Sequence, residues 1–283
     1  MKLGIALCGG GIRGVAHAGV LKALEENNIK IDAIGGTSSG SIVAALYAMG
    51  YSPYYIYILF KRYSKELIDQ KTISTITNIK SFLTNKKTQF KGFYTGKEIE
   101  DGFKEVALRK GIKNINDINM PIVIPAVDIG EAKEYIFTNN KLNKKNKKYI
   151  SDIPIGVAVR SSCSFPLFFN PCEYDNHIFL DGGVLNNVPA IEVKKQGVDK
   201  VLSVNFRAES VNEESNIMDI MMRTIDVMGS KISEENLSRS DYVLTIKTDK
   251  AGLLEIDKLD KCYKFGYKQT INNIDKILKL VNE

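Results

Sequence analysis

The chain has 283 residues, a net charge of +6, a hydrophobic content of 44% and a charged content of 25%. This length can bury a sizeable core, and the composition is typical of a soluble globular protein. The positive charge is modest for this length, and no nucleic-acid-binding motif accompanies the lysines, which excludes nucleic acid as an expected partner.

The first predicted unit is a strand that leads through a glycine loop into a helix. Leu3 to Cys8 is an apolar run typical of a buried strand, and a helical pattern runs from Val15 to Glu26. The loop between them reads Gly9-Gly10-Gly11-Ile12-Arg13-Gly14. Because the apolar run is short and meets the loop directly, we expect no signal peptide and a cytoplasmic location.

The second unit is a strand, a sharp turn and a helix. An apolar run from Ile31 to Ile34 predicts the strand, and small and apolar residues from Ser41 to Met49 predict the helix. The turn Gly36-Thr37-Ser38-Ser39-Gly40 has the G-x-S-x-G pattern of a nucleophile elbow. In such an elbow the glycines permit a strained turn, and Ser38 stands at a helix start where free N–H groups favour negative charge.

The rest of the chain predicts helices that alternate with strands. We expect a helical subregion at about 51–110 beside the active site, and a buried strand at Pro121–Asp128. Glu134–Thr138 and Lys148–Ile150 are expected to form a hairpin. Further helices are predicted at Pro154–Ser161, Pro189–Gln196, Ser215–Leu237 and Leu259–Leu280, and strands at Ile178–Leu180, Val201–Phe206 and Tyr242–Ile246. This order predicts one α/β domain over 1–283, with three layers, helix–sheet–helix, and a mainly parallel central sheet.

A third motif, Asp181-Gly182-Gly183, follows the predicted strand at Ile178–Leu180. A glycine loop that presents N–H groups, a nucleophilic serine and an acidic residue at a strand end together make a hydrolase constellation. The three motifs resemble, in this order, the G-G-G-x-[R/K]-G, G-x-S-x-G and D-G-[G/A] of the patatin-like phospholipases. The segment Ser161-Ser162-Cys163-Ser164-Phe165-Pro166-Leu167-Phe168-Phe169 is similar to the segment before that family's aspartate. The resemblance spans roughly residues 1 to 205 and implies a patatin-like fold.

The resemblance implies a catalytic dyad of Ser38 and Asp181. Serine needs a base to take its proton, and the chain has two histidines, His17 and His177. We expect His17 to be a structural residue near the glycine loop and His177 to be a loop residue, so that neither reaches Ser38. Asp181 would then act as general base and return the proton to the leaving alcohol. The alternative for Asp181 is an aspartate that merely starts an Asp-Gly turn.

The glycine loop is expected to supply the oxyanion hole. Gly9, Gly10 and Gly11 have no side chains that block the approach of an oxygen to their N–H groups. Arg13 either fixes the loop or favours an anionic head group, and an exposed arginine that opens the helix is the alternative. The remaining motif glycines are expected to support the turns: Gly14, Gly36, Gly40, Gly182 and Gly183.

The first forty residues also allow a dinucleotide-binding interpretation. Gly9, Gly11 and Gly14 satisfy G-x-G-x-x-G, and Asp32 lies at a sequence distance suited to a ribose. Asp32, however, begins the second strand instead of ending it, which is the wrong end for the ribose. This interpretation also leaves the serine and aspartate motifs unexplained, so we favour the hydrolase.

No metal or cofactor is expected, because no cluster of His, Cys and carboxylates is evident in the sequence. The four cysteines include no C-x-x-C pair and are expected to be reduced thiols, mostly structural: Cys8, Cys163, Cys172 and Cys262. The stretch Ala33–Phe60 has no charged residue, but glycines and a proline interrupt it too often for a transmembrane span. Its aromatic part, Tyr54 to Phe60, is expected to pack on the core, with an acyl-chain channel or membrane contact as the alternative.

Two lysine-rich segments carry part of the positive charge. Lys141–Lys148 is the densest, and a second group is formed by Lys80, Lys86, Lys87 and Lys91. A solvated loop is the favoured interpretation, and attraction to an anionic membrane surface at the protein's periphery is the alternative.

The motifs together predict a serine acyl hydrolase that cleaves fatty-acyl esters of phospholipids or related lipids through an acyl-enzyme. Two alternatives stay open: an acyltransferase on the same scaffold, in which an alcohol or thiol replaces water, and a catalytically silent lipid-binding module. The related transferase fold normally uses a histidine where Asp181 stands. A silent module has no reason to keep Ser38, Asp181 and the glycine loop together.

Overall fold

The computed structural model describes residues 1–69, 92, 94–140, 146–207, 217–248, 251–252 and 255–282. The strands are β1 (Leu3–Leu7), β2 (Ala33–Gly36), β3 (Ile122–Asp128), β4 (Lys133–Thr138), β5 (Tyr149–Ile150), β6 (Cys172–Tyr174), β7 (His177–Asp181), β8 (Lys200–Phe206) and β9 (Tyr242–Ile246). The α-helices are α1 (Val15–Glu26), α2 (Ser39–Ala48), α3 (Pro53–Asp69), α5 (Lys97–Leu108), α6 (Ile155–Ser162), α7 (Ala190–Lys194), α8 (Ile217–Ser238), α9 (Leu259–Ile271) and α10 (Ile274–Asn282). Short 3₁₀ turns are η1 (Gly11–Gly14), η2 (Ile115–Asp117), η4 (Gly182–Val184) and η5 (Ile256–Lys258).

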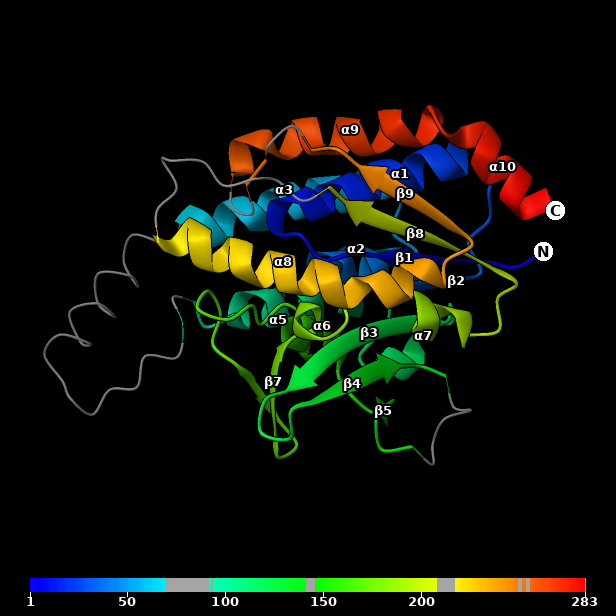
Figure 1. The fold of residues 1–283 in the computed structure, drawn as a ribbon. Helices are drawn as coiled ribbons and strands as arrows, with labels where there is room; N and C mark the ends of the chain where they lie inside the picture. The colour runs from blue at the N-terminus through cyan, green and yellow to red at the C-terminus, as the bar shows by residue number, and fades with distance from the viewer. Residues whose placement is uncertain are drawn as a thin grey trace, which may run out of the picture.

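The strands form one sheet in the order β5-β4-β3-β2-β1-β8-β9, with β7 paired to β3 and β6 paired to β7 (Figure 1). The pairs from β3 through β2, β1 and β8 to β9 are all parallel. Every residue of β1, β2 and β3 is buried, as expected for parallel strands that are covered on both faces. The mainly parallel sheet is confirmed.

Helices cover the two faces of the sheet. On one face, a side chain added at Gly4 of β1 would lie 2.5 Å from Val193 of α7, so α7 packs directly on the strands. Helices α1 and α2 pack beside each other, with α2 against β2, and α9 lies along α1. That last contact is close, because a Cβ on Gly266 would lie 2.0 Å from the carbonyl oxygen of Ala16. With α8 crossing in front of the sheet in Figure 1, the three-layer α/β architecture is confirmed.

Strand β3 determines where the segments after β2 and β7 meet. Its first residues pair with β2, whereas Ala126 to Asp128 pair with β7 in the antiparallel sense. Because β4 occupies the other edge of β3, β2 and β7 lie end to end on the same edge. Asp181, the last residue of β7, therefore points back toward the end of β2, where the chain turns into Ser38.

Three predictions about elements require comment. The hairpin of Glu134–Thr138 with Lys148–Ile150 is wrong, because β4 and β5 pair in parallel and the antiparallel partner of β4 is β3. The single helix at Leu259–Leu280 is also wrong, because α9 ends at Ile271 and α10 begins at Ile274. In the predicted helical subregion, α3 and α5 are helices, and residues 70–91 and 93 lie outside the described residues.

Candidate active site

The elbow at Ser38 has the strained geometry that its motif predicts. Ser38 has φ 52° and ψ −126°, a conformation that non-glycine residues rarely adopt, and α2 begins at the next residue. A Cβ on Gly36 would lie 2.2 Å from the carbonyl oxygen of Gly40, and a Cβ on Gly40 would lie 2.5 Å from that of Leu7. Side chains at these two positions would push the turn apart, so the glycines allow the sharp exit from β2.

Asp181 lies at this elbow and is 2% exposed. Its Oδ1 accepts the N–H of Gly183 at 2.8 Å, whereas Oδ2 makes no hydrogen bond of good geometry within the described part of the chain. Burial raises the pKa of Asp181 from 3.8 to about 7, against the smaller lowering effects of the Ser38 hydroxyl and the Gly183 N–H. The structure thus brings the predicted nucleophile and the predicted base together.

The segment at the end of α6 links Ser38 to Asp181. The Ser38 N–H donates to Oγ of Ser162 at 3.0 Å, and the Asp181 N–H donates to the carbonyl oxygen of Ser164 at 3.0 Å. Between them, Cys163 Sγ lies 3.7 Å from Oγ of Ser41 on α2. The small residues of this segment therefore hold the end of β2 and the end of β7 at a fixed distance from each other.

Asn187 is a residue of the site that the sequence analysis did not single out. The Gly9 N–H donates to the Asn187 side-chain Oδ1 at 3.0 Å and to its backbone carbonyl at 3.3 Å. A Cβ on Gly9 would lie 2.6 Å from Asn187 Oδ1 and 3.0 Å from the Cβ of Ser38, so Asn187 and Ser38 flank the same point. Asn187 also lies beside Gly183, and it therefore connects the glycine loop to the turn after Asp181.

The N–H groups of the glycine loop are not equivalent. Those of Gly9 and Gly10 are engaged, the first by Asn187 and the second by Oγ of Ser39 at 3.1 Å. Among the described residues, the N–H groups of Gly11 and Ser39 have no acceptor. Both stand at helix starts, Gly11 at η1 and Ser39 at α2, where N–H groups are free for an anion.

Arg13 fixes the loop from inside the protein. It is 4% exposed, its Nε donates to the carbonyl oxygen of Gly10 at 3.1 Å, and its guanidinium lies 5.7 Å from the ring centroid of Phe206. The alternative of an exposed arginine is therefore wrong. Two further motif glycines lie where the neighbouring chain leaves no room for a side chain. A Cβ on Gly14 would lie 2.4 Å from Ser39 Oγ, and a Cβ on Gly182 would lie 2.4 Å from the Pro125 carbonyl oxygen.

Neither histidine contacts Ser38. His17 is fully buried, its Nε2 lies 2.8 Å from the Cys8 carbonyl oxygen, and burial lowers its pKa to about 4. It also stacks on Phe206 at 4.8 Å, which confirms its structural role near the loop. His177 is the first residue of β7 and not a loop residue, so it stands at the opposite end of the strand from Asp181.

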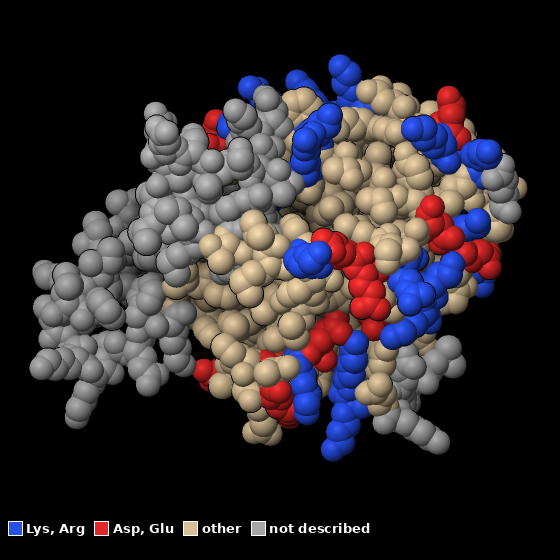
Figure 2. Space-filling view, viewed as in Figure 1, with Lys and Arg blue, Asp and Glu red and all other residues tan. Residues whose placement is uncertain are grey.

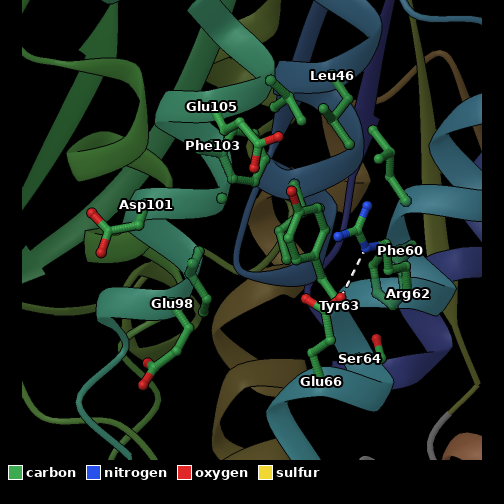
Figure 3. A pocket seen from close by; sticks show the side chains of 15 residues that line it. Leu46, Phe60, Arg62, Tyr63, Ser64, Glu66, Glu98, Asp101, Phe103 and Glu105 are labelled. Atoms are coloured by element: carbon green, nitrogen blue, oxygen red, sulfur yellow. Dashed lines mark hydrogen bonds and ion pairs between the residues drawn. The ribbon is translucent and has the colours of Figure 1, made fainter.

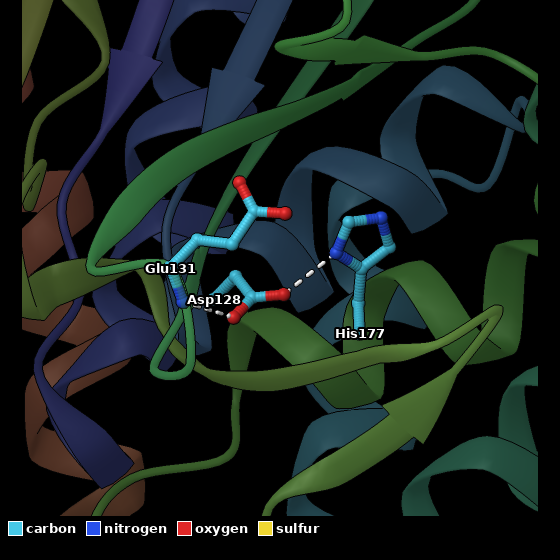
Figure 4. A group of neighbouring side chains, drawn as sticks. All are labelled: Asp128, Glu131 and His177. Carbon is cyan, nitrogen blue, oxygen red and sulfur yellow. Dashed lines mark hydrogen bonds and ion pairs between the residues drawn. The ribbon is translucent and has the colours of Figure 1, made fainter.

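His177 belongs to a cluster that the sequence analysis did not anticipate. Asp128, Glu131 and His177 each offer one side-chain atom that could bind a metal, and these atoms lie within 4.8 Å of one another (Figure 4). His177 Nδ1 and Asp128 Oδ2 are 2.6 Å apart, and Asp128 Oδ1 accepts the Glu131 N–H at 2.9 Å. Glu131 Oε2 accepts from Lys133 and Tyr135. These hydrogen bonds connect Asp128 to His177 and to the Glu131 backbone, and Glu131 to Lys133 and Tyr135.

Many charged side chains on the surface of the described residues form ion pairs. Figure 2 shows basic and acidic side chains interleaved on one face. Lys148, at the end of the predicted lysine-rich segment, pairs with Glu134 and Glu192. Lys141 to Lys145 and the second lysine group lie outside the described residues, so membrane contact stays a prediction.

Within the described part of the chain, no helix combines the length and apolar character needed to cross a bilayer. All four cysteines are buried, and no disulfide joins them in the structure.

The family model of patatin-like phospholipases matches residues 5–194, which include all three motifs. The chain belongs to the patatin-like phospholipase family. It is 29% identical over 293 aligned residues to lysophospholipase NTE1 of Candida albicans, covering 94% of this chain but only 19% of that protein. It is 30% identical to the probable lipid hydrolase 463L of invertebrate iridescent virus 6, over 65% of this chain and 61% of that one.

The fold also resembles that of a protein of known structure. The crystal structure of VipD from Legionella pneumophila superposes with a TM-score of 0.53 over 97% of this chain and 67% of that chain, at 14% identity. The dinucleotide-binding interpretation is therefore wrong for this family member. Its glycine loop lies against the nucleophile elbow, and Asp32 accepts the N–H of Leu3 at 3.0 Å at the start of the strands.

Proposed function

We propose that this family member is a serine acyl hydrolase of lipid esters, with Ser38 as nucleophile and Asp181 as general base. The observation that carries the proposal is a buried carboxyl group with a raised pKa beside a serine held at a strained elbow. Perturbed pKa values of this kind gather at catalytic sites. The names of the fungal and viral relatives, a lysophospholipase and a probable lipid hydrolase, support the substrate class.

In the first step, ionised Asp181 takes the proton of Ser38 Oγ as Oγ attacks the ester carbonyl carbon. The C=O π electrons move to the carbonyl oxygen, and a tetrahedral oxyanion forms. When it collapses, the bond to the alcohol oxygen breaks, and Asp181 returns the proton to that oxygen. Water then attacks the acyl-enzyme carbonyl while Asp181 takes one of its protons. The bond between Ser38 Oγ and the acyl carbon breaks, Asp181 returns the proton to Oγ, and the fatty acid leaves.

The oxyanion is held by N–H groups from two helix starts. The N–H groups of Gly11 and Ser39 are available, because neither has an acceptor among the described residues. The N–H groups of Gly9 and Gly10 keep the loop in position through Asn187 and Ser39. This division of labour refines the expectation that all three loop glycines bind the oxyanion directly, and one such donor contributes about 3 kcal/mol to transition-state stabilisation.

Hydrolysis is favoured over the two alternatives. The related transferase fold normally pairs its serine with a histidine, whereas here Asp181 lies at the elbow and neither histidine contacts Ser38. The silent module is disfavoured, because a lipid-binding protein gains nothing from the strained φ of Ser38 or from the buried, unpaired Oδ2 of Asp181.

The test is covalent labelling combined with turnover. A fluorophosphonate probe should label the wild type at Ser38, and the protein should hydrolyse p-nitrophenyl butyrate. Ser38→Ala should lose both activities and keep the melting temperature of the wild type, whereas Ser52→Ala, an exposed serine at the start of α3, should keep both. Undiminished turnover by Ser38→Ala would contradict the proposal. With glycerol present, acyl-glycerol as the main product would favour the transferase.

A further inference from the structure

A pocket of about 260 Å³ lies between α2, α3 and α5. Its apolar wall is formed by residues of all three helices: Ile42 and Leu46 of α2, Leu59 and Phe60 of α3, and Ile99, Phe103 and Val106 of α5. Leu46, Tyr63 and Phe103 converge on it from the three helices (Figure 3). In the aromatic part of α3, Leu59 and Phe60 pack on the core, as predicted, and also line this pocket. The prediction is wrong for Tyr54, Tyr55 and Ile58, which are exposed.

The pocket starts one helical turn from the nucleophile. The N–H of Ile42 donates to the carbonyl oxygen of Ser38 at 3.3 Å, and residues four apart share a helix face. Ser38, Ile42 and Leu46 therefore follow one another along α2. Most of α2 is buried, but Ser38 and Ile42 are both partly exposed, and Ile42 lines the pocket.

The walls select the chemistry of the occupant. The volume is just below the roughly 300–1,000 Å³ of pockets that hold drug-sized ligands, so it suits one hydrocarbon chain and not a two-chain lipid. The polar part of the lining carries four carboxylates and one guanidinium: Glu66, Glu98, Asp101, Glu105 and Arg62. Arg62 is paired with Glu66 at 2.8 Å. This surplus of negative charge disfavours a phosphate or a free fatty-acid carboxylate and favours an uncharged tail.

We propose that this pocket binds the acyl chain of the ester that Ser38 attacks, one chain at a time, with the methyl end away from Ser38. The inference rests on the proposed function and specifies its substrate: a lipid recognised through a single acyl chain. Each methylene that enters should raise kcat/KM about fourfold until the pocket is full, after which longer chains should give no further gain.

The test is a chain-length profile on p-nitrophenyl esters from acetate to palmitate. In the wild type, kcat/KM should rise with chain length and then level off. Val106→Phe fills the pocket, and it should lower the ratio of octanoate to acetate turnover at least tenfold. Leu108→Phe is the matched control, because Leu108 lies on the same helix, is 48% exposed and does not line the pocket, and it should leave the ratio unchanged.

A second measurement needs no variant. Fluorophosphonates with alkyl chains of increasing length should label Ser38 of the wild type at rates that follow the same rise and plateau. A flat labelling series, or an unchanged ratio in folded Val106→Phe, would overturn the pocket assignment and leave the proposed function standing. Absence of both labelling and turnover with every reagent would instead overturn the proposed function.

Discussion

Two buried aspartates on paired strands show how this protein makes a base. Asp128 ends β3 and Asp181 ends β7, and they are 3% and 2% exposed. Asp128 faces His177 at 2.6 Å and accepts the Glu131 N–H, and these bonds hold its pKa below the usual value despite burial. Asp181 has one N–H donor and an unpaired Oδ2, and burial raises its pKa to about 7. Both side chains are nearly inaccessible to water, but Asp181 is enclosed by protein on all sides whereas Asp128 lies near the surface. The opposite pKa shifts therefore reflect both the deeper enclosure of Asp181 and the stronger hydrogen-bond partners of Asp128.

The comparison shows that a carboxyl group becomes a base near neutral pH when it is enclosed by protein and has few hydrogen-bond donors. A carboxylate with a histidine at hydrogen-bond distance is a stable anion and a poor proton acceptor. Asp181 has no basic side chain among its described hydrogen-bond partners, so its carboxylate is destabilised and takes a proton readily near neutral pH. The two aspartates are thus matched controls for each other, one that would serve catalysis and one that serves the fold.

The largest expected effect is on turnover. Asp181→Asn keeps the shape of the side chain but removes the base, and kcat on p-nitrophenyl butyrate should fall about 10⁴-fold, the scale seen when a triad member is disabled. Asp128→Asn, the matched change, should leave kcat within a few-fold of the wild type. Rates of the two purified, folded variants on the same ester decide the point. Comparable losses in both would show that the two aspartates do not differ in role.

The next effect is on stability, and its sign should differ between the two sites. Folded Asp181 has a pKa of about 7 against 3.8 in the unfolded chain, so the folded state binds the extra proton between these values and loses stability as pH rises through them. At pH 8, Asp181→Asn should therefore be more stable than the wild type, by on the order of 4 kcal/mol at most.

Asp128 has the opposite sign. Its folded pKa is lowered, so its contribution to stability is present above the ordinary aspartate pKa and is lost as pH falls through the folded pKa. Asp128→Asn should destabilise the protein at pH 8 by about 1–3 kcal/mol, because His177 and the Glu131 N–H lose a charged partner. Urea unfolding at pH 8 measures both variants, and a stability loss in Asp181→Asn equal to that in Asp128→Asn would contradict the contrast.

Asn187 gives a smaller effect that sharpens the description of the site. Asn187→Ala removes the side-chain acceptor for the Gly9 N–H and leaves only the longer bond to the backbone carbonyl of residue 187. The kcat should fall about 10- to 100-fold with KM little changed, less than for loss of a direct oxyanion donor. Asn187→Asp keeps an acceptor and adds a negative charge beside Ser38 and Gly183. It should move the pH profile of kcat/KM upward, because a second carboxylate raises the pKa of Asp181. An unmoved profile would show that Asn187 acts on folding alone.

The smallest expected effect is that of a chelator. The dyad chemistry needs no metal, and the Asp128, Glu131 and His177 cluster stands at the opposite end of β7 from Asp181. Treatment with EDTA should leave turnover of a soluble ester unchanged within error. Complete loss of turnover, restored by added calcium or zinc, would contradict both the dyad and the structural role of the cluster.

The parts of the site that are local in sequence could be predicted from it. The elbow at Ser38, the glycine loop and the aspartate after β7 are each recognisable because strand, turn and helix signals adjoin the motif. Long-range contacts could not be predicted in this way. Asn187 holds Gly9, and Asp128 meets His177 only because β7 pairs with the far end of β3. In the sequence, the adjacent asparagines Asn186 and Asn187, soon after Gly183, were the signal that could have identified Asn187 as a residue of the site.

The errors in the fold prediction have the same origin. Helix α9 stops at Ile271 although the apolar pattern continues, because Asn273 donates to the Gln269 carbonyl at 2.8 Å and accepts the Tyr242 hydroxyl of β9 at 3.1 Å. A side chain that bonds to the backbone and to a neighbouring strand competes with the helix. Likewise, β4 pairs with β3 across a turn that places Glu131 against Asp128, and no hairpin signal in the sequence identified this.

The ionisation of Asp181 is most directly tested by the pH dependence of kcat/KM in His177→Asn, which reports the free enzyme. With His177 removed and the pKa of His17 at about 4, neither histidine titrates near neutral pH. The raised pKa predicts that kcat/KM on p-nitrophenyl butyrate still rises tenfold per pH unit below about 7 and is level above it, as in the wild type. Loss of the ionisation near pH 7 in this variant would contradict Asp181 as the base and assign that role to His177.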